Sequence, residues 1–122
     1  MPMKAAHSCR SIIVHCIDFR IQKFLTSWVE DLKDGYDRLS IAGGVKDLPF
    51  VLEQLEVSHR LHHIKEVYLI NHEDCGAYGK QGSAGTHIRD LLKAQKEIVE
   101  KYPGLKVILY YLKLNGSFEP VD

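Results

Sequence analysis

Hydrophobic residues follow two different spacings along the chain. Consecutive apolar and β-branched residues are typical of strands that are buried on both faces of a sheet. Such segments predict four strands, over residues 11–17, 38–42, 67–70 and 107–112. Apolar residues three and four positions apart are typical of helices with one buried face. This second spacing predicts helices over residues 21–32 and 88–102.

Residues that begin and end regular structure lie between these segments. Asp47 is suited to cap a helix N-terminus and Pro49 to occupy the first turn, so together they predict a third helix that runs to about residue 64. Residues 103–104, Pro-Gly, end the last predicted helix. Residues 115–116, Asn-Gly, are a strong signal for a two-residue hairpin turn and predict a short final strand.

The elements alternate between strand and helix, which predicts an α/β fold with a parallel sheet flanked by helices. About four strands are expected to be parallel, followed by the short C-terminal hairpin strand. No internal repeat or linker-like segment interrupts the pattern, so residues 1–122 are expected to form a single domain. In sheets of this kind the functional site lies beyond the carboxyl ends of the strands, where the strand order reverses.

Composition narrows the class of protein. Of the 122 residues, 45% are hydrophobic and 26% are charged, as in an ordinary globular protein. Lys and Arg together number 16, as do Asp and Glu, so a nucleic-acid or anionic-membrane partner is not expected. No apolar run approaches the ~20 residues of a transmembrane helix. The three cysteines argue against a disulfide framework and favour a reducing, cytoplasmic location.

Residues with catalytic chemistry follow two of the predicted strands. Cys16, Asp18 and Arg20 come at the end of the first strand, and alternate positions of an extended segment share one face. His72 and Cys75 follow the third strand, on a turn. If these two strands are neighbours, the three Cys and His side chains can bind one zinc ion. Three protein ligands leave the fourth tetrahedral position open, which is the arrangement of a catalytic zinc site.

Each fragment also has a simpler interpretation when it is taken alone. Cys16 within an apolar strand can be a small buried hydrophobic residue. Asp18 and Arg20 can form a surface ion pair of little energetic value. An isolated His-x-x-Cys pattern is weak. Their joint occurrence at successive strand ends makes a zinc site the favoured interpretation.

Other candidate motifs are less convincing. Residues 79–81 lack the surrounding frame of a phosphate-binding loop, and three residues between Cys16 and Arg20 are too few for the loop of a thiol phosphatase. The helix histidines, at 59, 62 and 63, are best explained as a solvated surface because no third ligand is evident near the pair His59 and His63. His7 and Cys9 are interpreted as incidental.

Three motifs together resemble the β-class carbonic anhydrases. They are Cys-x-Asp-x-Arg at residues 16–20, Ala-Gly-Gly-Val-x-Asp at residues 42–47 and His-x-x-Cys-Gly at residues 72–76. The stretch 111–121 also resembles the C-terminal strand pair of that family. The resemblance covers most of residues 11–79 and returns near residue 107.

The resemblance implies a function and a set of site residues. Cys16, His72 and Cys75 would be the zinc ligands, and Asp18 paired with Arg20 would be the catalytic dyad. The reaction would be the reversible hydration of carbon dioxide to bicarbonate and a proton. Family members form homodimers that share active sites, so a homodimer or a higher homo-oligomer is expected here.

Two glycines are expected near the substrate, and two features of the chain depart from the family pattern. Backbone groups of Gly43 and Gly44 are expected to approach the substrate closely, since neither residue has a side chain. Phe19 stands where the family usually has a small residue, and the segment 76–106 is shorter than usual. The alternative function is a zinc-binding relative with lost or altered activity. It would be a carbonyl sulfide or carbon disulfide hydrolase, or would serve in binding or assembly, since a fold does not fix a substrate.

Overall fold

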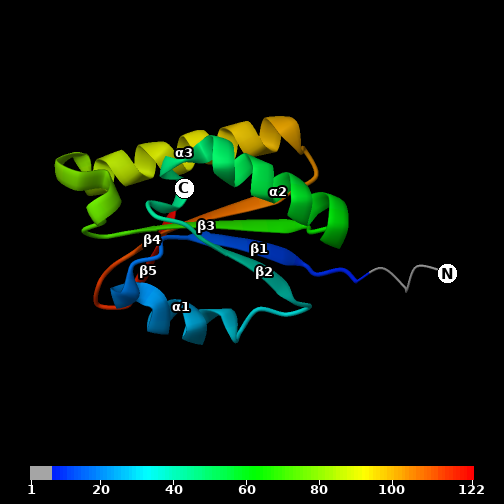
Figure 1. Ribbon diagram of the computed structural model, residues 1–122, viewed down its shortest axis with the longest axis horizontal. Coiled ribbons are helices and arrows are strands. Elements are labelled where there is room, and N and C mark those ends of the chain that lie inside the picture. Colours follow the sequence, from blue (N-terminus) through cyan, green and yellow to red (C-terminus); the bar gives the residue numbers. More distant parts are fainter. Residues whose placement is uncertain (1–6) are drawn as a thin grey trace.

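A five-stranded sheet runs through the centre of the molecule in the order β2-β1-β3-β4-β5 (Figure 1). The computed structural model describes residues 7–122. The first four strands along the chain are parallel and the fifth is antiparallel to β4, as the sequence predicts. Their bounds are β1 Ser11–His15, β2 Tyr36–Ser40, β3 Glu66–His72, β4 Lys106–Leu112 and β5 Phe118–Val121.

Helices cover both faces of this sheet and form a three-layer arrangement. Helix α1 (Gln22–Val29) lies on one face, and α2 (Leu48–His62) and α3 (Ala84–Lys101) lie side by side on the other (Figure 1). Three short 3-10 helices connect the elements: η1 Phe19–Ile21, η2 Gly44–Lys46 and η3 Gly76–Gln81. Each face of the sheet therefore buries its own hydrophobic core, one with α1 and one with α2 and α3.

All the predicted strands and helices are present, and capping interactions explain most of the differences at their ends. Asp47 is the N-cap of α2, its side chain accepting a hydrogen bond from the backbone N–H of Phe50 at 3.3 Å. Helix α3 begins at residue 84, earlier than predicted, because Ser83 caps it by accepting from the N–H of Thr86 at 3.2 Å. Helix α1 ends at Val29, and the following residues form i to i+3 turn hydrogen bonds instead.

Strands β1, β3 and β4 differ from the prediction in length, and β2 lies two residues earlier than predicted. Strand β1 ends at His15 rather than at residue 17, so Cys16 lies just beyond it. Strand β2 runs from Tyr36 to Ser40 and β3 from Glu66 to His72. The hairpin turn between β4 and β5 is centred on residues 114–115, with Gly116 in the left-handed region at φ 94° and its N–H bonded to the Lys113 carbonyl. The extra Gly116 position is the bulge that a three-residue hairpin loop requires.

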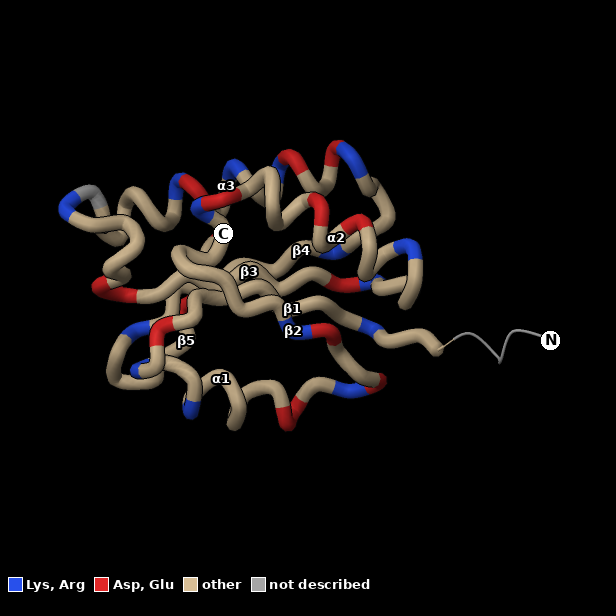
Figure 2. The backbone as a smooth tube through the Cα atoms, viewed as in Figure 1, with Lys and Arg blue, Asp and Glu red and all other residues tan. Residues whose placement is uncertain are grey.

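Charged residues lie mainly on helix α3 and in the segments that connect the elements. Basic and acidic residues are interspersed along α3, and α2 carries two Glu and one Arg, whereas the central strands carry few charges, as Figure 2 shows. None of the helices within residues 7–122 combines the length and the apolar character needed to cross a membrane.

Candidate metal centre

The strand order reverses between β1 and β3, and the predicted ligands meet there. Strand β2 lies on one side of β1, and β3 lies on the other, with β4 beyond it. Cys16 directly follows β1, His72 is the last residue of β3, and Cys75 precedes η3. The carboxyl ends of two adjacent parallel strands thus bring together side chains that lie 56 and 59 positions apart in the chain.

The three side chains have the spacing of metal ligands. One donor atom from each of Cys16, His72 and Cys75 lies within 4.8 Å of the other two, and all three residues are buried. The two sulfur atoms are 3.8 Å apart, far longer than a disulfide bond. Two thiolates on one tetrahedral zinc ion, with Zn–S bonds of about 2.3 Å, would lie about 3.8 Å apart. The sulfur positions therefore fit a tetrahedral ion of this size.

The imidazole of His72 presents one nitrogen to the two sulfurs. Its Nδ1 lies 2.7 Å from the Glu73 carbonyl oxygen, to which it can donate a hydrogen bond. Its Nε2 is buried and has no hydrogen-bond partner within residues 7–122. A buried nitrogen of this kind is costly unless something binds it, and a metal ion is the partner that two adjacent sulfurs suggest.

The two thiols differ in acidity. Burial raises the pKa of Cys16, but the His72 imidazole and the backbone N–H of Gly43, which donates to the Cys16 sulfur at 3.3 Å, outweigh it and lower this pKa to about 7. Burial and the neighbouring Cys16 raise the pKa of Cys75 above its usual value. Two thiolates this close repel each other, so ionising both requires a cation between them.

Asp18 and Arg20 form a bidentate ion pair at the rim of the centre. Arg20 donates from Nε to both Asp18 carboxylate oxygens, at 3.1 and 3.2 Å, and from Nη2 to Oδ2 at 2.6 Å. These hydrogen bonds hold the pKa of Asp18 down to about 2. The Asp18 Oδ2 atom also lies 3.8 Å from His72 Nε2. An ionised carboxylate is therefore fixed beside the three ligands.

An open cleft of about 720 Å³ leads to these groups. Its polar wall contains Asp18 and Arg20, and Ala42, Ile17 and Phe19 supply apolar surface. The side chains of Ile17 and Phe19 are 59% and 85% exposed, respectively. The cleft thus has room for a small molecule beside both the ligand set and the carboxylate.

A family comparison decides what kind of protein has this arrangement. The model of the family described as "Putative carbonic anhydrase" matches residues 6–122. The chain belongs to this family. The resemblance in the Cys-x-Asp-x-Arg and His-x-x-Cys motifs is therefore confirmed at the level of the family.

A curated relative and two solved structures are also similar to this chain. An uncharacterized protein of Rickettsia bellii is 26% identical over an alignment of 140 positions, which covers 98% of this chain and 85% of the relative. A carbonic anhydrase from Glaciozyma antarctica has a TM-score of 0.70 at 17% identity, covering 99% of this chain and 85% of that one. A β-carbonic anhydrase of Aspergillus fumigatus has a TM-score of 0.63 at 17% identity, and the match covers 95% of this chain and 76% of that one. These structures share the carbonic anhydrase fold.

The two glycines near this carbonic anhydrase-like site have different surroundings. The N–H of Gly43 approaches the Cys16 sulfur. Gly44 instead packs against the side chain of Asn71, leaving no space for a Cβ atom, and adopts a left-handed φ of 60°. Neither glycine lines the cleft. The contact with substrate predicted for both residues stays a prediction.

The sequence did not reveal two groups that support the site. Asp74 accepts a hydrogen bond from Arg20 Nη1 at 3.0 Å, and its carbonyl accepts from Nη2 at 2.8 Å. Gln22 donates to the carbonyl oxygens of Cys16 and Asp18 at 3.0 and 2.8 Å. Asp74 lies between His72 and Cys75, and this position within the motif is the feature of the sequence that could have indicated its role. Gln22 sits on the polar side of a helix, and nothing in the sequence distinguishes it from other polar helix residues.

Proposed function

We propose that this protein is a zinc-dependent carbonic anhydrase, which interconverts carbon dioxide and bicarbonate with release or uptake of a proton. The observation that carries this proposal is the convergence of Cys16, His72 and Cys75 beside a fixed carboxylate, with Cys16 and Asp18 lining one open cleft. Membership of the carbonic anhydrase-like family supports it.

The three buried donors would hold the zinc ion. Two thiolates and one neutral imidazole give a divalent ion a formally neutral set of ligands, so the buried site needs no further counter-ion. Bound there, zinc supplies a Lewis acid that makes water nucleophilic near neutral pH. The N–H of Gly43 stabilises the thiolate form of Cys16, and the carbonyl of Glu73 orients His72.

Asp18 is the group that orients the reacting water in this proposal. Its low pKa keeps it ionised at any physiological pH, so it accepts a hydrogen bond from the reacting water and orients that water toward the substrate carbon. Arg20 holds Asp18 in this position through a planar two-pronged contact. Asp74 fixes the far side of the same guanidinium. Arg20 and Asp74 are positioning residues in this scheme.

The cleft suits a small uncharged substrate. Ala42 and Ile17 give apolar surface beside the ionised pair, so carbon dioxide can approach without displacing Arg20 from Asp18. A carboxylate that is already paired attracts cations weakly and leaves the site open to neutral molecules. Carbonyl sulfide has a similar size, and a direct assay separates the two substrates.

Metal content and stopped-flow hydration test this function together. We expect about one zinc ion to be lost from the chain in Cys16→Ser and in Cys75→Ser, with loss of carbon dioxide hydration in both. Asp18→Asn should keep this zinc and lower the hydration rate by roughly 100-fold or more, as expected when the group that orients the reacting water is lost. Asp34→Asn is the matched control, because Asp34 is an exposed carboxylate distant in sequence from the site.

Two results would contradict the proposal in different ways. Unchanged zinc content in both cysteine variants would refute the ligand set. Zinc bound by the wild-type protein without hydration of carbon dioxide would leave the ligands in place but refute the activity. Hydrolysis of carbonyl sulfide in that second case would identify the related hydrolase.

A further inference from the structure

A second group of metal-binding side chains lies at the other end of the sheet. Cys9 precedes β1, Asp37 is in β2, and His62 is the last residue of α2. One donor atom from each lies within 4.8 Å of the other two. Strand β1 separates Cys9 from Cys16, so this group is distinct from the candidate metal centre. Nothing in the carbonic anhydrase proposal uses these residues.

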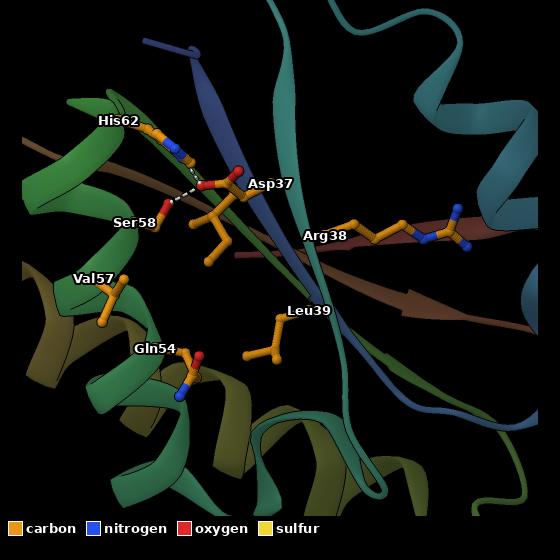
Figure 3. Close-up of a pocket in the computed structure, with 8 residues that line it drawn as sticks. Asp37, Arg38, Leu39, Gln54, Val57, Ser58 and His62 are labelled. Carbon is orange, nitrogen blue, oxygen red and sulfur yellow. Dashed lines mark hydrogen bonds and ion pairs between the residues drawn. The ribbon is translucent and has the colours of Figure 1, made fainter. Parts of the chain in front are cut away.

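The three side chains are held together by specific contacts. Asp37 Oδ2 lies 2.6 Å from His62 Nδ1 and accepts a hydrogen bond from Ser58 Oγ at 2.7 Å. Figure 3 shows the Asp37 carboxylate turned toward Ser58 and His62 on α2. The backbone N–H of Cys9 donates to the His62 carbonyl at 3.1 Å, which keeps Cys9 beside the helix end. Three separate elements thus contribute one donor each.

No lysine or arginine in residues 7–122 neutralises the Asp37 carboxylate. Its ion-pair partner there is His62. Arg38, the next residue, points to the opposite side of β2 in Figure 3 and donates to His15 Nε2 at 2.8 Å. Arg10 is paired with Glu66 at 3.1 Å. Within residues 7–122, no Lys or Arg side chain therefore competes with a cation for this carboxylate.

Space and further donors surround the group. A cavity of about 170 Å³ between β2 and α2 is lined by Asp37, Ser58 and His62. The ring of His7 packs edge-on against that of His62, with 4.9 Å between the ring centroids. A second imidazole therefore stands next to His62.

We propose that Cys9, Asp37 and His62 form a second binding site for a divalent zinc-class ion. One thiolate, one carboxylate and one imidazole match the ligand types that zinc prefers, and the two anionic ligands balance its charge. The ion joins the segment before β1 to the edge strand β2 and to the end of α2. Its role is structural, because it fastens three elements at a distance from the cleft.

Metal entry requires a small rearrangement that the site allows. The 2.6 Å between His62 Nδ1 and Asp37 Oδ2 is a hydrogen-bond length. Two such ligands on one tetrahedral zinc ion would lie about 3.3 Å apart, from bond lengths of about 2.0–2.2 Å. The ion replaces the proton between these two atoms, and the Cys9 thiol releases its own proton to solvent as its sulfur binds the metal. Both side chains are about 30% exposed and can separate by this amount.

Metal counting tests the second site. Metal-free protein in reducing buffer is dialysed against Zn²⁺, and bound zinc is measured by mass spectrometry. We expect Cys9→Ser and His62→Gln each to bind one equivalent fewer than the wild-type chain, with affinity for that equivalent lowered by more than about 100-fold, since a ligand matters more than its outer partners. His59→Gln, which removes a histidine of the same helix, should bind as much as wild type. The readout is a difference from wild type, so failure of the carbonic anhydrase proposal would not change it.

A second measurement uses the wild-type chain, so its result does not depend on whether the variants fold. Cys9 is the partly exposed cysteine, whereas Cys16 and Cys75 are buried. Saturating Zn²⁺ should slow alkylation of Cys9 by iodoacetamide at least about 10-fold, as followed by peptide mass mapping, because a metal-bound thiolate is withheld from the reagent. Equal zinc content in wild type and either variant overturns the site, and so does zinc-independent alkylation of Cys9.

Discussion

Substituting Gly44 by alanine should destabilise the protein more than the same change at other glycines. Gly44 has a φ of 60°, and an added Cβ would overlap the Oδ1 atom of Asn71. The left-handed backbone costs alanine about 1–2 kcal/mol. Asn71 Oδ1 also accepts a hydrogen bond from the N–H of Val45 at 3.2 Å in a buried position, and displacing it costs about 1–3 kcal/mol more. The free energy of unfolding should fall by about 2–5 kcal/mol in total.

Two other glycines separate these contributions. Gly79 also has a positive φ, 58°, but with ψ −141° and no atom within 4 Å of an added Cβ, so Gly79→Ala should show only the cost of its own backbone conformation, about 1–3 kcal/mol. Gly104 has neither feature, and Gly104→Ala should raise stability by about 0.4–1 kcal/mol because alanine restricts the unfolded chain. Urea unfolding of each variant at fixed zinc concentration measures these changes.

A double-mutant cycle with Asn71→Ala isolates the steric contact. In that background the Cβ introduced by Gly44→Ala no longer meets an amide oxygen, so the substitution should cost only its backbone share of about 1–2 kcal/mol. An equal cost with and without Asn71 would refute the packing explanation. A cost below about 1 kcal/mol in the wild-type background would refute both contributions.

Three further predictions follow from the ionisable and apolar groups. Burial lowers the pKa of His15 and of His87 to about 4. Their contribution to stability is therefore complete above the unfolded pKa of about 6.5 and is lost as the pH falls toward 4, so the free energy of unfolding should drop by about 2 kcal/mol per histidine between about pH 7.5 and 5. Urea unfolding at both pH values checks this, and constant stability would contradict it. Arg20→Ala should abolish hydration activity by releasing Asp18, and a crystal structure of the variant should show that carboxylate turned toward the three ligands rather than in its present place. Sedimentation equilibrium should give a homodimer, because Ile17 and Phe19 expose apolar surface at the cleft; a monomer at micromolar concentration would rule this out.

The sequence by itself determined the elements and their order. The run of apolar residues within 11–15 reflects burial of both faces of β1, and burial of this kind is visible in the order of residues alone. Asp47 marked the start of α2 because a cap acts within one helical turn. Side-chain pairs that are close together in the sequence could be predicted for the same reason, since they depend only on local structure. Asp18 and Arg20 lie two positions apart, and a turn can bring them together whatever the rest of the chain does.

Only the tertiary structure decided how distant segments meet. Cys16 and Cys75 are 59 positions apart, and their 3.8 Å separation depends on β1 pairing with β3 rather than with another strand. The packing of Gly44 against Asn71 likewise depends on where η2 crosses the sheet. Cys9 seemed incidental in the sequence, since neither Asp37 nor His62 is near it along the chain. Contacts of this kind arise from side-chain packing between elements, and no local pattern of residues encodes them.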